Sequence, residues 1–116
     1  MSIRRIGAGA RMSKAVVHGH TVYLAGQVAD QSKGASVAEQ TQEIVGIIDA
    51  LLAEAGSDKT KILSATIYLS DISTFPQMNA VWDTWVVAGH TPARATVEAK
   101  LAAPEYTVEI AVIAAI

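Results

Sequence analysis

The segment 106–115 constrains the fold more than any other part of the chain. Its ten residues are nearly all apolar, and several are β-branched. The run is far shorter than the about 18 apolar residues that a membrane span needs. Strands that are apolar on both sides occur where both faces of a sheet are covered. The segment therefore predicts a central strand, in which Glu109 is the exceptional charged residue.

A long amphipathic helix is predicted over residues 37–55. Ser36 and Glu39 have the spacing of a capping box, in which each side chain satisfies a backbone N–H of the other residue. Apolar residues then recur at helical spacing, and Gly56 is placed to end the helix in the left-handed region. Glu43, Asp49 and Glu54 fall on the polar side, and we expect them to form a solvated face.

A second helix is predicted to begin at Asp71 or Ser73 and to end at Gly89, before Pro92. Its apolar residues share one face of the helix: Phe75, Met78, Trp82, Trp85 and Val86. The remaining strand-favouring segments are 2–6, a hairpin of 14–18 and 21–25 about Gly19-His20, 61–69 and 93–101. This order predicts an α+β fold in a single domain, residues 1–116, with two helices on one face of a mixed sheet.

The strand at 93–101 alternates strictly between small or apolar residues and polar ones. Arg94 and Thr96 share its polar side. We expect these two residues, with Glu109, to lie on the sheet face that the helices leave uncovered. Two interpretations of Arg94 remain open. It forms a structural ion pair with Glu109 on a neighbouring strand, or its planar guanidinium binds a substrate carboxylate.

Composition and charge narrow the classes of function. The chain is 51% hydrophobic and only 17% charged, which is unlike a disordered protein and predicts an apolar surface patch suited to an interface. A net charge of −2 without a basic stripe predicts no nucleic-acid partner and no membrane partner. The absence of cysteine excludes disulfides and thiolate metal sites and favours a cytoplasmic location. His18 and His20 lack further ligands nearby in the sequence, so no metal site is expected.

Residues 92–101, followed by Val108-Glu109-Ile110, closely resemble the signature of the reactive-intermediate deaminase family. This family is also called the YjgF/YER057c/UK114 family and was once labelled endoribonuclease L-PSP. Residues 24–28 and the stretch from Asp71 to Ala80 resemble two further family segments, so that the resemblance covers nearly the whole chain in order.

The resemblance implies a chorismate-mutase-like α+β fold assembled as a homotrimer, with sites between neighbouring subunits. It also implies hydrolysis of reactive enamines and 2-imino acids, such as 2-aminoacrylate and its imino tautomers, to 2-keto acids and ammonia. The family uses no metal or organic cofactor. The alternative is a non-catalytic trimer of the same fold that binds small carboxylates or acts as a regulator.

The resemblance also implies roles for individual residues. Arg94 matches the arginine that binds the substrate carboxylate, and Glu109 matches the glutamate near the ligand and its water. Asn79 matches an asparagine that lines the cleft, and Gly26 a glycine whose backbone approaches the ligand. Thr96 stands where many members have cysteine.

Three positions depart from the family pattern. Met12 occupies the position of a tyrosine that closes the cleft and is expected to contact substrate in its place, and Arg11 adds a charge beside it. Ala111 replaces a second acidic residue in the last strand. These departures indicate a divergent subgroup.

Overall fold

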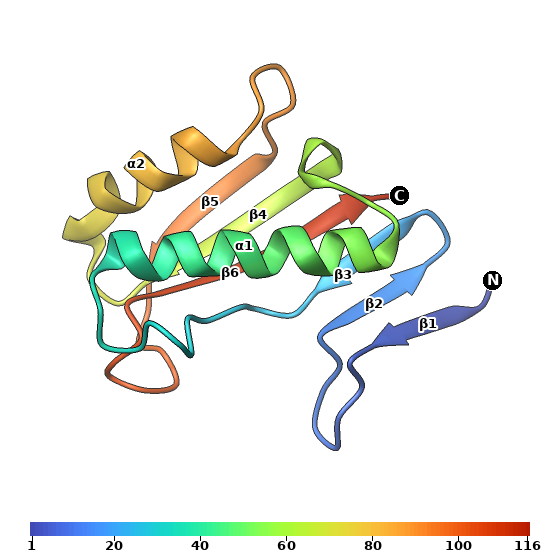
Figure 1. Ribbon diagram of the computed structural model, residues 1–116, viewed down its shortest axis with the longest axis horizontal. Coiled ribbons are helices and arrows are strands. Elements are labelled where there is room, and N and C mark those ends of the chain that lie inside the picture. The colour runs from blue at the N-terminus through green and yellow to red at the C-terminus, as the bar shows by residue number, and fades with distance from the viewer.

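The last strand in chain order, β6 (Val108–Ala115), lies inside a six-stranded sheet with the order β1-β2-β3-β6-β4-β5. The computed structural model describes all residues 1–116 and is drawn in Figure 1. The other strands are β1 (Ile3–Ile6), β2 (Ala15–His18), β3 (Thr21–Leu24), β4 (Ile62–Leu69) and β5 (Ala93–Glu98). The sheet is mixed, as predicted, because β4 and β5 run parallel and all other pairs are antiparallel.

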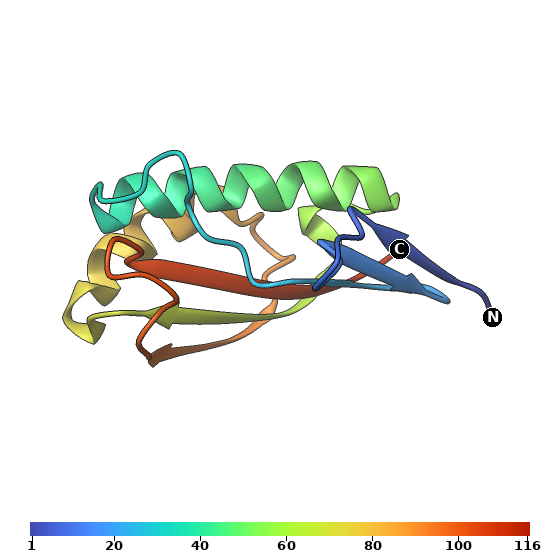
Figure 2. The same ribbon diagram turned by 90° about the horizontal axis from the view of Figure 1, so that it is seen from below.

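Both helices, α1 (Val37–Ala55) and α2 (Phe75–Trp85), cover the same face of the sheet, which confirms the predicted layering. Figure 2 shows this arrangement edge-on: the helices lie above the strands, and nothing from this chain lies below them. Helix α2 forms the crossover between the parallel strands β4 and β5. Neither helix has the length and apolarity that crossing a bilayer would demand.

The alternation along β6 separates the two faces of the sheet. Val108, Ile110 and Val112 are buried under the helices. Glu109 and Ile113 point to the opposite face, which we call the open face, and are only half-buried. Within one chain, therefore, β6 is covered on one side only, whereas the sequence predicted cover on both.

Helix α1 has the predicted bounds. The Ser36 hydroxyl accepts the backbone N–H of Glu39 (3.2 Å), and Gly56 ends the helix at φ 86°. Only half of the predicted capping box forms, because the Glu39 carboxylate accepts from the Ser36 hydroxyl (3.3 Å) and not from its backbone.

Helix α2 ends at Trp85, before the predicted Gly89. The backbone of Val86 is already extended (ψ 154°), so the chain leaves the helix there. At the other end, Asp71 caps a short 3-10 turn, Ile72–Thr74, which leads into Phe75. The cap at Asp71 is one of the two alternatives that the sequence offered.

Candidate functional site

The strand order separates Arg94 from Glu109, because β4 lies between their strands. Arg94 pairs with Ala65, which is buried beneath the helices, whereas Glu109 pairs with Tyr68 on the open face. Residues opposite each other in a sheet share a face. The prediction that Arg94 and Thr96 lie on the open face was therefore wrong, and no ion pair joins Arg94 to Glu109 within the chain.

Arg94 instead faces helix α2. Its guanidinium carbon lies 5.5 Å from the centre of the Phe75 ring and 5.4 Å from the centre of the Trp82 ring, both within cation–π range. The side chain is half-buried and makes no hydrogen bond or ion pair with any residue of the chain. A partly buried guanidinium whose N–H donors have no acceptor within the chain is suited to bind an anion.

Two buried oxygen atoms on the same two elements also lack partners. Thr96 pairs with Ile67 and so shares the helix-facing side of β5 with Arg94. Its hydroxyl oxygen and the amide oxygen of Asn79, one helical turn after Phe75, are buried without a hydrogen bond. Buried polar atoms are nearly always hydrogen-bonded in native proteins. The three residues Arg94, Thr96 and Asn79 form what we call the arginine group.

Gly26 and Glu109 form a second group, at the junction of β3 and β6. A Cβ atom on Gly26 would overlap a carboxylate oxygen of Glu109, so the glutamate lies directly against the glycine backbone. Gln27 and Ile110 hold this junction by exchanging backbone hydrogen bonds of 2.9 Å and 3.1 Å. We call this pair the glutamate group.

Met12 lies beside the glutamate group. Its carbonyl accepts the N–H of Gly9 (2.8 Å) and so tightens the loop that joins β1 to β2. Met12, Lys14 and Gly26 line a groove of about 590 Å³, and the Met12 side chain is 56% exposed. Arg11 is exposed next to it and forms no ion pair. The structure thus places the predicted site residues in two places on one chain.

Helix α1 fixes the loop that follows the glutamate group. The Glu43 carboxylate accepts the backbone N–H groups of Gln31 (3.1 Å) and Ser32 (2.7 Å) and the Ser32 hydroxyl (2.6 Å). The hydrogen bond from the Ser32 side chain is the main reason that the pKa of Glu43 lies below its ordinary value. Asp49 similarly accepts the indole N–H of Trp85 (3.0 Å). The expected solvated face is confirmed for Asp49 and Glu54, which are exposed, whereas Glu43 is half-buried against the loop that it binds.

The same helix fixes the loop before β6. Gln40 is fully buried, donates to the carbonyls of Ala35 (3.0 Å) and Glu105 (2.9 Å), and accepts the N–H of Thr107 (2.9 Å). Sequence reasoning missed this role. The available signal was a polar residue within the apolar stripe between Val37 and Ile44.

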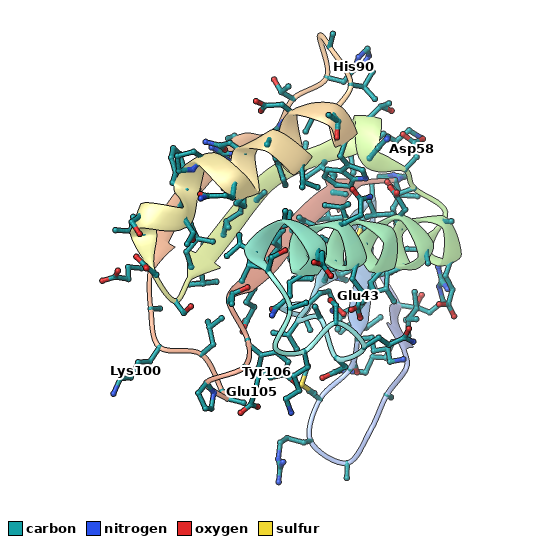
Figure 3. The ribbon with its side chains drawn as sticks, turned by 60° about the vertical axis from the view of Figure 1, so that its left-hand side comes forward. Glu43, Asp58, His90, Lys100, Glu105 and Tyr106 are labelled. Atoms are coloured by element: carbon teal, nitrogen blue, oxygen red, sulfur yellow. The ribbon has the colours of Figure 1, made fainter.

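A hydroxyl–carboxylate contact joins the loop after β3 to the loop before β6. The Tyr106 hydroxyl donates to Asp30, and this bond raises the pKa of Tyr106. Lys33 pairs with Glu105 at 3.7 Å beside it. Figure 3 shows Glu105 and Tyr106 at the opposite end of the molecule from Asp58 and His90. No three His, Cys, Asp or Glu side chains gather where a metal ion could be held.

The chain was compared with known proteins. The family model described as "Endoribonuclease L-PSP" matches residues 2–116. A RutC family protein of Haemophilus influenzae is 47% identical over 98% of both chains, and the RutC family protein YoaB of Escherichia coli is 47% identical over 100% of both. The crystal structure of NMB1025 from Neisseria meningitidis, described as a YjgF family member, has a TM-score of 0.96 and 48% identity, covering 99% of this chain and 95% of that one. The chain belongs to the YjgF/YER057c/UK114 family that its signature resembles.

Proposed function

We propose that the protein hydrolyses reactive enamines and 2-imino acids to 2-keto acids and ammonia. The observation that carries the proposal is the unpartnered guanidinium of Arg94, half-buried within the family signature. A 2-imino acid has one anionic group, its carboxylate, next to an electrophilic C=N carbon. A bidentate guanidinium–carboxylate pair would hold that carbon in a fixed place.

The reaction needs a positioned water besides the substrate. In the proposed mechanism the Glu109 carboxylate accepts a hydrogen bond from that water and takes its proton as the oxygen attacks the imine carbon. That proton is returned to the imine nitrogen, which gives a tetrahedral carbinolamine. The carbinolamine hydroxyl then gives its proton to the nitrogen through Glu109 as the C–N bond breaks, so that the C=O bond of the 2-keto acid forms and ammonia leaves. We place Asn79 and Thr96 in the lining of the same cleft, because each has a buried oxygen without a hydrogen-bond partner in the chain.

We further propose that the site is completed between subunits of a homotrimer. Arg94 and Glu109 lie on opposite faces of one sheet, so one chain does not direct both at the same imine. A neighbouring copy would bring its glutamate group, with Met12, to the arginine group of the first. The apolar open face supports this assembly, because large apolar surfaces mark interfaces.

The test is an assay in which an amino-acid oxidase generates imino acids and the release of keto acid is followed. Arg94→Ala should lower kcat/KM at least about 100-fold. The kcat/KM of Arg94→Lys should lie between those of the parent and Arg94→Ala, because an ammonium cannot bind a carboxylate bidentately. Arg4→Ala, an exposed arginine of β1 on the helix-facing side of the sheet, serves as the matched control. Turnover unaffected by Arg94→Ala would refute the proposal. Carboxylate binding without turnover would favour the non-catalytic alternative.

A further inference from the structure

The guanidinium of Arg94 is held by aromatic rings and not by hydrogen bonds. Phe75 and Trp82 both belong to α2 and lie two helical turns apart, so they present their rings on the same side of the helix. The guanidinium carbon lies 5.5 Å from one ring centre and 5.4 Å from the other. Stacking against a ring restrains the plane of a guanidinium but uses none of its N–H donors.

The Trp82 ring is itself held in place by contacts with a second tryptophan. It is 5% exposed and packs against Trp85, with ring centres 5.2 Å apart and planes inclined at 57°. Trp85 in turn donates its indole N–H to Asp49 of α1 (3.0 Å). A chain of contacts therefore runs from the long helix to the guanidinium. Phe75, at the beginning of α2, is 36% exposed and forms the outer wall.

We propose that Phe75 and Trp82 are positioning residues for carboxylate binding: their rings hold Arg94 in the orientation that receives a small 2-keto or 2-imino carboxylate. The inference rests on the proposed function, since that function makes Arg94 the carboxylate ligand. An unrestrained arginine must lose its rotamer freedom each time it binds an anion. A guanidinium already oriented by two rings loses less, which strengthens binding.

Trp82 also provides a readout that needs no catalysis. The protein has two tryptophans, Trp82 and Trp85, whose ring centres lie 5.2 Å apart, so the tryptophan emission of the unaltered protein reports on the surroundings of Arg94. Titration with 2-oxobutanoate should change this emission as the carboxylate binds Arg94. The same titration of the Arg94→Lys protein should give a much smaller change, because the ammonium does not stack on the ring in the same way.

The decisive comparison uses the same titration. Phe75→Leu should weaken 2-oxobutanoate binding about tenfold, with the loss in turnover appearing mainly in KM. Phe75→Tyr keeps a ring and should stay within about twofold of the parent. Ile72→Ala, which removes exposed apolar surface just before the same helix, is the matched control and should also stay within about twofold.

The outcomes separate this inference from the proposed reaction. Unchanged binding in Phe75→Leu, or an equal loss in Ile72→Ala, overturns the positioning role. Absence of 2-oxobutanoate binding by the parent protein overturns it as well. If the parent binds 2-oxobutanoate and Phe75→Leu weakens that binding, the positioning role holds even when no imine is turned over. In that case only the proposed reaction fails.

Discussion

Gly26 is required by space and not by backbone conformation. It is absent from the glycines that adopt a positive φ, yet a Cβ there would overlap the Glu109 carboxylate. The overlapping atoms are the far end of a flexible side chain, which can rotate away at small cost to the fold. The glycine therefore determines where the carboxylate lies.

Gly26→Ala should accordingly leave the melting temperature within a few degrees of the parent but lower imine hydrolysis at least about tenfold, because Glu109 is displaced. Thermal unfolding and the oxidase-coupled assay measure the two effects. A variant that unfolds at a much lower temperature would show that the junction has a structural role instead, and full activity would show that the position of Glu109 is unimportant.

Glu43 gives the fold a dependence on pH. Its folded-state pKa is depressed, so its stabilising effect is present above the ordinary carboxyl value of 4.5 and disappears as the pH falls through the lower folded value. Glu43→Gln should lower the free energy of unfolding by about 1 kcal/mol near neutral pH.

The difference between parent and Glu43→Gln should shrink as the pH falls below the ordinary carboxyl value, in urea unfolding followed by circular dichroism. Glu54→Gln is the matched control, since this exposed residue of the same helix makes no hydrogen bond or ion pair. A gap between parent and Glu43→Gln that is constant with pH would contradict the account.

Helix α1 shows which elements the sequence predicts well. Its bounds depend on local features, namely a hydroxyl cap, a helical apolar stripe and a terminal glycine, and all of them were readable. The face of β5 was not readable in this way. Alternation shows which residues share a side, but whether Arg94 faces the helices depends on its non-local pairing with β4.

The candidate site shows the same difference between what local patterns predict and what depends on non-local pairing. The residue types of the arginine group and the glutamate group were identified from the chain, because they stand in a recognisable signature. Their separation follows from non-local strand pairing: β4 lies between β5 and β6, and its register places Arg94 opposite Ala65 and Glu109 opposite Tyr68, on different faces. The stacking of Phe75 and Trp82 on Arg94 was missed for the same reason: their spacing indicated only a core-facing stripe.

Gly46 of α1 offers a test of helix energetics. It is exposed in the middle of the helix, and a Cβ would meet nothing within 4 Å. Gly46→Ala should stabilise the protein by about 0.5–1 kcal/mol in urea unfolding. Gly34→Ala is the matched contrast, because its surroundings are equally open but its φ is +83°, so that substitution should destabilise. Equal effects of the two changes would contradict this reasoning.

At the scale of the whole molecule, the open face is the side of the sheet that no element of the chain covers. The side chains there are mainly small or apolar and include Tyr23, Ala95, Val97, Ala111 and Ile113. Few charged side chains lie among them, Arg5 and Glu109 being on the same face. The proposed trimer would bury this face.

Ile113→Lys should therefore yield a folded but dissociated and inactive protein, because a buried ammonium without a partner is costly at an interface. Sedimentation velocity measures the assembly and circular dichroism the fold. Ala53→Glu, on the exposed side of α1, should change neither assembly nor activity. Retention of the trimer and full activity in Ile113→Lys would show that the open face is not the interface.

The position of β6 also has a consequence during synthesis. A ribosome releases the hairpin strands β1 to β3 first and the β4–α2–β5 unit later, and these two parts of the sheet do not pair with each other. Only β6, emerging after both, pairs with β3 on one side and β4 on the other. Until then the edges of β3 and β4 that β6 will pair remain open, and unpaired strand edges are prone to aggregation. The two parts of the sheet can join only after β6 has been translated.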